Sequence, residues 1–547
     1  MGMKKLILSV SFLWIVHIGW CQKMASQNWH WKDYSSDSVH GISLVKAYQQ
    51  LASLPQKPTS IIVAVIDGGI DTNQLDLKPY LWINTKEIPG NGIDDDHNGY
   101  IDDIRGWNFL GNSKGQNINK AASEKTRIYH AYKLAFENVK IDSTHWSKTQ
   151  FKQYQDWLDA AKEVEFSDED AANLQYLKMA FSAIKKIGGI LLKELSDSSF
   201  TIQTLADYQP ISRTVLEAKM AYLRTAPILG IEKETSFKEL IEDLGEYIEG
   251  KEIASTAKQN PPLNARTIIG DNYNAINDRF YGNPDITGPN AKHGTHVAGL
   301  VASIPDSSIK WSPNCIKIMG IRAVPDGDEY DKDIALAIFY AVDNGAKIIN
   351  MSFGKSFSPE QPWVDSAIRY AAQKDVLLIH SAGNEAYDLD LKSVYPNPVS
   401  FLHKDTAKNI LTIGASSAIF INGSLLTDFS NYGPKIVDVF SPGNKIYSTI
   451  PGLHSFGYLQ GTSMASPIVS HIAALIRAYY PNLTAIQVKE IIMNSVWKPA
   501  DTKTSFTIPQ KDFTKTLSQM VAAGGIVNAN NALVLAKQVA FKSKIKK

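Results

Sequence analysis

The chain has 547 residues, more than one hydrophobic core usually serves, so its length predicts one large domain with a substantial addition. Lysine and arginine number 56 against 55 acidic residues, and this balance excludes a global field that would attract nucleic acid or an anionic membrane. With 44% hydrophobic and 20% charged residues, the composition is typical of a folded globular protein rather than a disordered one.

The first 21 residues join the basic stretch MGMKK to the apolar run LILSVSFLW and to small residues suited to cleavage. This pattern is typical of a secretory signal peptide over 1–21, and it predicts an exported protein, periplasmic or secreted, with no membrane span after cleavage. An uncleaved membrane anchor and a lipid attached to Cys21 are the alternatives, although the run is short for a span. Cys315 would be the only other cysteine, so no intramolecular disulfide is expected.

A continuous apolar run from Ile61 to Ile66, rich in β-branched residues, ends at Asp67 and two glycines. It predicts a buried strand with a carboxylate at its carboxyl end. Similar runs, separated by helix-like segments, lie within 315–324, 346–354, 375–384 and 409–416. The alternation predicts an α/β fold, with a mostly parallel central sheet and helices on both faces. Ligands of such sheets bind beyond the carboxyl ends of the strands, where Asp67 and Asn384 both lie.

The segment NGIDDDHNGYIDD spaces Asp94, Asp96 and Asn98 by two residues, and its central glycine allows the sharp turn of a calcium loop. The strict EF-hand pattern fails because the twelfth position is Arg105 rather than glutamate, so Asp102 or Asp103 would have to complete the shell. A solvated acidic turn is the alternative interpretation. The candidate ligands of a structural calcium ion are Asp94, Asp96, Asn98, Tyr100 and Asp102.

From about Asn117 to Lys258 the sequence changes to charged, helix-like segments, with a capping-box pattern at Ser167 and Asp170. Two helices are expected within 212–225 and 236–249, and a longer one precedes them. The longer helix carries one apolar stripe, formed by Leu174, Leu177, Phe181, Ile184, Leu191 and Leu195. The whole segment predicts a small helical bundle in which the stripe is core packing rather than a groove for a partner.

Two histidines, His293 and His296, stand three apart where the apolar run of AKHGTHVAGL begins. Ser463 follows a glycine and precedes an apolar helical pattern with an early proline, which predicts a helix start. A serine hydroxyl becomes an effective nucleophile when a histidine takes its proton, and a carboxylate fixes the tautomer of that histidine. Singly, each residue also has a structural interpretation, as a turn residue, a buried histidine or a helix cap. Ser416, in GASSA, partly matches a nucleophile elbow but lacks its final glycine.

The blocks VIDGGID, HGTHVAG, SAGN and GTSMASP resemble the four signature blocks of the subtilisin-like serine peptidases (subtilases, peptidase family S8), in the family's order. The resemblance implies Asp67 as the orienting carboxylate, His293 as general base and acid, and Ser463 as nucleophile. It implies the side chain of Asn384 as an oxyanion donor beside the Ser463 amide, and it leaves His296 as structural. The implied function is that of an exported serine endopeptidase that forms an acyl-enzyme intermediate.

The resemblance also implies an organisation and a mode of substrate binding. Residues 22–116 and 259–547 would form the catalytic domain, and 117–258 would be a mainly helical insertion. In the family the substrate lies as an extra strand against backbone that matches, in this chain, Ser352, Phe353, Gly354, Ser381, Ala382 and Gly383. Protein or peptide substrates and a monomeric state are expected.

The sequence departs from the family beside two of these residues. Gly68 stands where many members have serine or threonine, which removes a possible hydrogen bond to Asp67. Lys292 replaces a common glycine and would disfavour protonation of His293 unless it points away. Two other functions stay open: a latent or inactive relative that binds peptides, and a structural or chaperone role of the helical segment that does not depend on Ser463.

Overall fold

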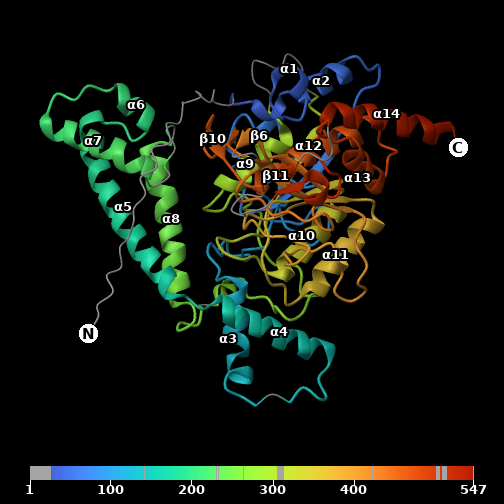
Figure 1. Cartoon of the computed structure of the whole chain (residues 1–547). Coiled ribbons are helices and arrows are strands. Elements are labelled where there is room, and N and C mark those ends of the chain that lie inside the picture. The colour runs from blue at the N-terminus through green and yellow to red at the C-terminus, as the bar shows by residue number, and fades with distance from the viewer. Residues whose placement is uncertain are drawn as a thin grey trace.

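The computed structural model in Figure 1 describes residues 26–140, 142–228, 231, 233, 235–262, 264–304, 313–421, 424–500, 505–507 and 514–545. The expected signal peptide over 1–21, with Cys21, lies outside these residues. Within them, no helix combines the length and the apolar character needed to cross a membrane.

An eight-stranded sheet forms the centre of the molecule, in the order β2-β3-β1-β4-β5-β6-β7, with β8 paired to β6. All neighbouring strands are parallel except β6 and β7, so the predicted mostly parallel α/β sheet is confirmed. Each apolar run of the sequence became one of these strands. The strands are β1 (Ile61–Asp67), β2 (Gly106–Asn108), β3 (Ile316–Arg322), β4 (Ile348–Met351), β5 (Leu377–Ser381), β6 (Ile410–Ile421), β7 (Ser424–Leu426) and β8 (Val439–Pro442).

Side chains of β1 alternate between two cores because successive residues of a strand point to opposite faces. Val63 and Val65 enter the core shared with α2, α9, α12, α13 and α14, whereas Ala64 and Ile66 enter the core shared with α10 and α11. Helices therefore cover both faces of the sheet, as predicted (Figure 1). They are α2 (Leu44–Ala52), α9 (Lys292–Ala302), α10 (Asp331–Asp343), α11 (Gln361–Gln373), α12 (Thr462–Tyr479), α13 (Ala485–Asn494) and α14 (Ala529–Ile545).

The segment between the two parts of the sheet region is helical, as expected, but its helices form two groups instead of one bundle. In Figure 1, α5 to α8 stand to the left of the sheet region, and α3 and α4 lie below it. The first group has its own core, in which Ile184 and Leu191 of the predicted stripe are buried. The second group packs on Phe357 of the sheet region, which covers its apolar face. The helices are α3 (Glu124–Phe136), α4 (Lys148–Glu163), α5 (Asp168–Leu195), α6 (Ile202–Asp207), α7 (Arg213–Ile228) and α8 (Phe237–Thr256).

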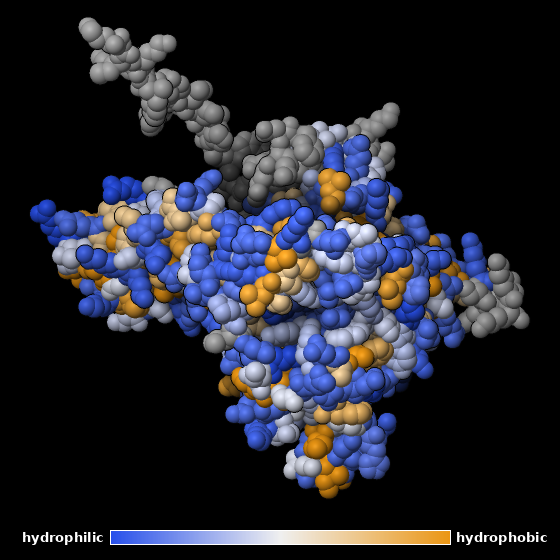
Figure 2. Space-filling view, turned by 90° about the horizontal axis from the view of Figure 1, so that it is seen from below, coloured by the Kyte–Doolittle hydropathy of each residue, from blue (hydrophilic) through white to orange (hydrophobic). Residues whose placement is uncertain are grey.

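Figure 2 shows one face of the molecular surface, on which hydrophobic residues gather in small groups between hydrophilic ones.

Short elements complete the fold. The remaining elements are α1 (Tyr34–Asp37), the paired strands β9 (Ile446–Thr449) and β10 (Phe456–Leu459), the paired strands β11 (Ser505–Thr507) and β12 (Thr514–Thr516), and the 3-10 turns Trp29–Trp31, Lys78–Tyr80, Ala265–Ile268 and Leu517–Gln519.

Candidate active site

Asp67 is the last residue of β1, a strand in the interior of the sheet. Its side chain is only 3% exposed, and its Oδ1 accepts a hydrogen bond of 2.7 Å from the backbone amide of Gly68. Gly68 has no side-chain hydroxyl to donate to Asp67, but its backbone amide donates to the carboxylate instead. A buried carboxylate at the end of a strand forms strong hydrogen bonds with donors that reach it.

His293 is such a donor, and it lies in the first turn of α9. Its Nδ1 donates to Oδ1 and Oδ2 of Asp67 at 2.9 and 3.0 Å. Burial opposes protonation, but the carboxylate outweighs it, so the pKa of His293 lies above its ordinary value. Gly294 permits this approach, since a Cβ there would lie 2.1 Å from the carbonyl oxygen of Gly69.

Ser463 lies in the first turn of α12, directly after Thr462. Its hydroxyl donates to the carbonyl oxygen of Ser352, just beyond β4, at 3.2 Å. Because β4 is the neighbour of β1, and α12 packs against α9, Ser463 and His293 lie at the same edge of the sheet. Catalytic hydrogen bonds often form only with substrate bound, so the contact with Ser352 is compatible with proton transfer to His293.

Asn384 follows β5 and is fixed by the start of α12. Its Oδ1 accepts hydrogen bonds from the amide and the hydroxyl of Thr462, at 2.9 and 3.0 Å. The carboxamide oxygen is thereby occupied, and Nδ2 is left to donate. A Cβ built on Gly461, whose φ is +146°, would lie 3.4 Å from this Nδ2 and 3.6 Å from the amide nitrogen of Ser463. Nδ2 of Asn384 and the amide of Ser463 thus both lie close to Gly461, at the start of α12.

The expected substrate strand follows β4 directly. The side chains of Ser352 and Phe353 are buried, whereas Gly354 is exposed. The carbonyl oxygen of Phe353 points inward and accepts a hydrogen bond of 2.8 Å from Nε2 of His380. Because Gly354 is exposed, its backbone is accessible to an added strand.

The second expected binding segment, from Ser381 to Gly383, backs onto the start of α12. Ser381 and Ala382 are buried. The amide of Gly383, at a φ of +98°, donates to the hydroxyl of Thr462 at 3.0 Å. The same threonine therefore orients both this segment and Asn384.

The two residues that the sequence left in question occupy separate environments. His296 is fully buried, its Nε2 donates to the carbonyl oxygen of Ile446 at 2.9 Å, and burial lowers its pKa to about 3, which suits a structural role. Lys292 directs its ammonium group to Asp243 of α8 at 3.7 Å. Its charge is thus engaged by the helical segment, away from the imidazole.

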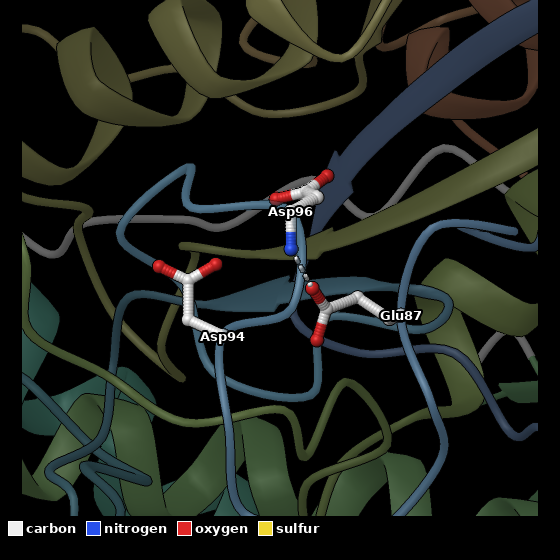
Figure 3. A group of neighbouring side chains, drawn as sticks. All are labelled: Glu87, Asp94 and Asp96. Carbon is white, nitrogen blue, oxygen red and sulfur yellow. Dashed lines mark hydrogen bonds between the residues drawn. The ribbon is translucent and has the colours of Figure 1, made fainter.

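The acidic loop contains a cluster of three carboxylates, shown in Figure 3. One oxygen each of Glu87, Asp94 and Asp96 lies within 4.8 Å of the others, and Glu87 also accepts a hydrogen bond of 3.0 Å from the amide of Asp96. Asp102, a predicted ligand, is not part of this cluster. Its two carboxylate oxygens accept hydrogen bonds from the amides of Gly90 and Gly92.

The other two predicted ligands remain near the cluster. The amide of Asn98 donates to Asp94 and Asp96, each at 3.1 Å. The ring of Tyr100 is buried among aromatic side chains, so only its backbone could serve an ion. The sequence did not indicate Glu87, because it lies outside the spaced aspartates; only the structure, in which it is 6% exposed, identifies it.

Comparison with known proteins identifies relatives of this chain. A model described as the Subtilase family matches residues 59–524. A thermophilic serine proteinase of Bacillus sp. (strain AK1) is 34% identical over 45% of this chain and 55% of its own length. Thermitase of Thermoactinomyces vulgaris is 30% identical over 39% of this chain and 70% of its own length. A solved cold-adapted subtilisin-like serine proteinase is 26% identical over 41% of this chain and 74% of that one, with a TM-score of 0.33. The chain thus spans about half the length of the first of these relatives.

Proposed function

The chain belongs to the subtilase family, and on this premise we propose that it is an exported serine endopeptidase that hydrolyses peptide bonds with Ser463 as nucleophile. The observation that carries the proposal is the pairing of His293 with the buried Asp67 at the sheet edge where α12 presents Ser463. We also propose that residues 117–258 form an insertion between the two parts of the catalytic domain, 22–116 and 259–547.

In the first half of the reaction, Oγ of Ser463 attacks the carbonyl carbon of the substrate, and its proton passes to Nε2 of His293. Asp67 holds Nδ1, which fixes the tautomer and stabilises the imidazolium. The proton then moves from Nε2 to the departing amine, the carbon–nitrogen bond breaks, and an ester to Ser463 remains.

In the second half, water attacks this ester and gives a proton to Nε2 of His293. The ester bond breaks, the acid product leaves, and Ser463 recovers its proton. In both halves negative charge develops on the substrate oxygen, and Nδ2 of Asn384 and the amide of Ser463 are the proposed donors to it; their common closeness to Gly461 supports this role. The hydrogen bonds from Thr462 to Oδ1 of Asn384 hold the carboxamide, which supports such a role because a donor already in place needs less reorganisation.

Substrate binding is proposed along Ser352–Gly354 on one side and Ser381–Gly383 on the other. Main-chain pairing of this kind accepts many sequences, which suits protein or peptide substrates. Export follows from the signal-like residues 1–21.

A structural calcium ion is proposed for the acidic loop. Three carboxylates from two segments, Glu87 with Asp94 and Asp96, repel one another unless a cation joins them, and hard oxygen ligands suit calcium. Asn98 and the backbone of Tyr100 are further candidate ligands, whereas Asp102 is engaged by Gly90 and Gly92. Such an ion would stabilise the fold and take no part in the reaction.

Covalent labelling with a fluorophosphonate tests the proposed activity. The purified mature protein is expected to be labelled, and Ser463→Ala is expected to lose the label while keeping its fold. Ser416→Ala is the matched control, because Ser416 is a fully buried serine of the sheet and should leave labelling unchanged. A folded wild-type protein without label would instead support the latent, peptide-binding alternative.

A further inference from the structure

The substrate strand has a short free edge. Gly354 is exposed, and neither its amide nor its carbonyl oxygen makes a hydrogen bond within the described part of the chain. The next residue, Lys355, is only 5% exposed, and its amide and carbonyl pair with Tyr395 at 3.1 and 2.9 Å. The edge available to a peptide therefore begins at Ser352, beside Ser463, and ends at Gly354.

The side chain of Lys355 is held by the first helix of the helical segment. Its Nζ lies 2.7 Å from Oε2 of Glu124, the first residue of α3, and 2.9 Å from Oδ1 of Asp331. It also donates to the carbonyl oxygen of Glu329 at 2.8 Å. The side chain of Lys355 is 2% exposed and that of Glu124 is 7% exposed, so this ion pair is shielded from water.

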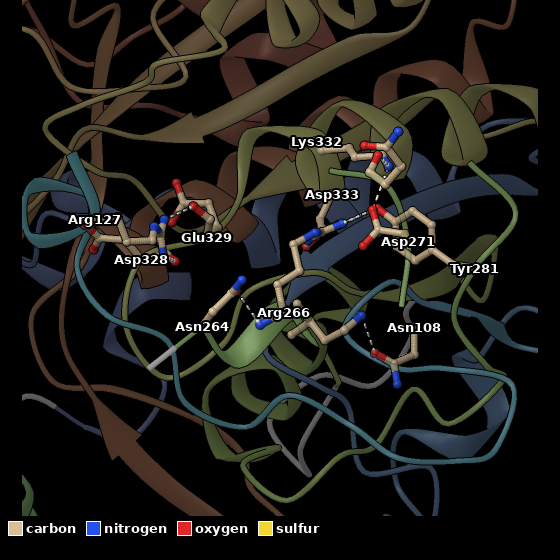
Figure 4. A network of polar contacts seen from close by, with 12 residues as sticks. Asn108, Arg127, Asn264, Arg266, Asp271, Tyr281, Asp328, Glu329, Lys332 and Asp333 are labelled. Atoms are coloured by element: carbon tan, nitrogen blue, oxygen red, sulfur yellow. Dashed lines mark hydrogen bonds and ion pairs between the residues drawn. The ribbon is translucent and has the colours of Figure 1, made fainter. Parts of the chain in front are cut away.

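The start of α3 is fastened in turn to the chain that precedes α10. The amide of Glu124 donates to Asp328 at 2.7 Å, and Arg127 pairs with Glu124 while donating to the carbonyl oxygens of Asp328 and Glu329. Figure 4 shows Arg127 beside Asp328 and Glu329. A buried lysine needs anionic and hydrogen-bonding partners, and Glu124, Asp331 and the carbonyl oxygen of Glu329 together fix where Lys355 lies.

We infer that the Glu124–Lys355 ion pair is a positioning device through which the inserted helix α3 shapes the substrate strand and closes it beyond Gly354. The inference rests on the proposed peptidase function. An antiparallel peptide with its reacting carbonyl at Ser463 runs past Gly354 with the residues that precede the cleaved bond. About three such residues can pair before the peptide reaches Lys355 and α3. Glu124 and Lys355 touch no reacting atom and act only through the position of the strand.

Peptides extended one residue at a time on the N-terminal side of the cleaved bond test the length of the edge. The value of kcat/KM is expected to rise over about three residues and to change less than about twofold beyond them. A continued rise over five or six residues would overturn the closure at Gly354. Labelling by a small fluorophosphonate reports the chemistry of Ser463 separately, so failure of the proposed function is recognised by loss of label in the wild-type protein.

The variants Glu124→Gln and Lys355→Met test the ion pair. In either variant KM for a three-residue peptide is expected to rise about tenfold or more, because a displaced strand loses binding geometry, while kcat and fluorophosphonate labelling change little. The two residues act through one contact, so the double variant is expected to lose less than the sum of the two single losses. Glu252→Gln, which breaks the half-exposed pair with Lys178 between α5 and α8, is the matched control and should leave KM unchanged.

Three results would contradict the inference. The single variants could leave KM for peptides unchanged. They could lower peptide turnover and labelling equally, as general loss of structure would. The double variant could also be as impaired as the sum of the two single ones, which would show that the two residues act independently.

Discussion

Replacing Asp96 by asparagine should change stability in opposite directions with and without calcium. The oxygens of Glu87, Asp94 and Asp96 lie within 4.8 Å of one another, and two unit charges at that distance repel by about 3.5 kcal/mol at an effective dielectric constant of 20, or about 1 kcal/mol in water. Asp96→Asn removes two of the three repulsions. Its Oδ1 contact with the amide of Asn98 can be kept, and only a 3.2 Å bond from Asn84 is lost.

In a chelator the variant is therefore expected to be more stable than the wild type, by about 1 kcal/mol or more after the loop's own hydrogen bonds are allowed for. In excess calcium the order should invert, because an ion at about one hundred times its Kd stabilises the wild type by about 2.7 kcal/mol, and the variant loses a ligand. Thermal unfolding in calcium and in chelator measures both signs; each kcal/mol moves Tm by about 2–4 °C or less at this size.

The matched control is Asp95→Asn. Asp95 lies between the two aspartates but accepts from the amide of Ile88 and the side chain of Asn91, outside the cluster. It should shift Tm by the same amount in both buffers. If Asp96→Asn also shifts Tm equally and in the same direction in calcium and in chelator, the loop holds no calcium and is a solvated acidic turn.

Three further changes test the reaction and the buried charges. Asn384→Ala should lower kcat by about two to three orders of magnitude, the loss known for such a donor in subtilisin, with KM little changed; an unaltered kcat would remove Asn384 from the oxyanion site. Asp67→Asn leaves burial to lower the pKa of His293, so the small residual activity should persist to lower pH, and an acid limb that stays in place would contradict the assigned base. Burial raises the pKa of Glu329 to about 8, so the folded state holds a proton that the unfolded state has lost above its ordinary 4.5, and stability falls as pH rises between these values. Glu329→Gln should therefore gain up to about 1.4 kcal/mol per pH unit over the wild type in that window, whereas the exposed Glu252→Gln should gain nothing.

The strands and the starts of α9 and α12 could be predicted from the sequence because local patterns specify them. The run before Asp67 is apolar on both faces, as a buried parallel strand requires, and the glycine before Thr462 marks a conformation with φ of +146° that other residues rarely adopt. The placement of Asp67 beside His293 then follows from the topology, since α9 begins at the edge where β1 ends.

Contacts between segments far apart in the chain could not be predicted in this way. Glu124 and Lys355 are 231 residues apart, and each alone is an ordinary charged residue next to a helix or a strand. The grouping of α3 with α4 depends on Phe357, which lies in another part of the chain. Hydrophobic periodicity predicts which face of a helix is buried, but it does not identify the surface that covers that face.

Buried charges join both ends of the helical segment to one short stretch at the start of α10, residues 331–333. At the entering end, Lys355 bridges Glu124 and Asp331. Just after the C-terminal end of the segment, Arg266 pairs with Asp333 at 2.6 Å, within the network shown in Figure 4. Replacing buried ion pairs with apolar residues is often neutral or stabilising, so the role of these pairs is better explained by geometry. Lys355 and Arg266 each join two carboxylates, and these contacts fix how the segment packs against α10. Cys315 is the only cysteine among the described residues, so no disulfide within them could hold the segment in place. At the entering end, the contacts of Glu124 and Asp331 that fix α3 are also those that hold Lys355, so on the proposed function the packing of α3 and the geometry of the strand beside Ser463 depend on the same contacts.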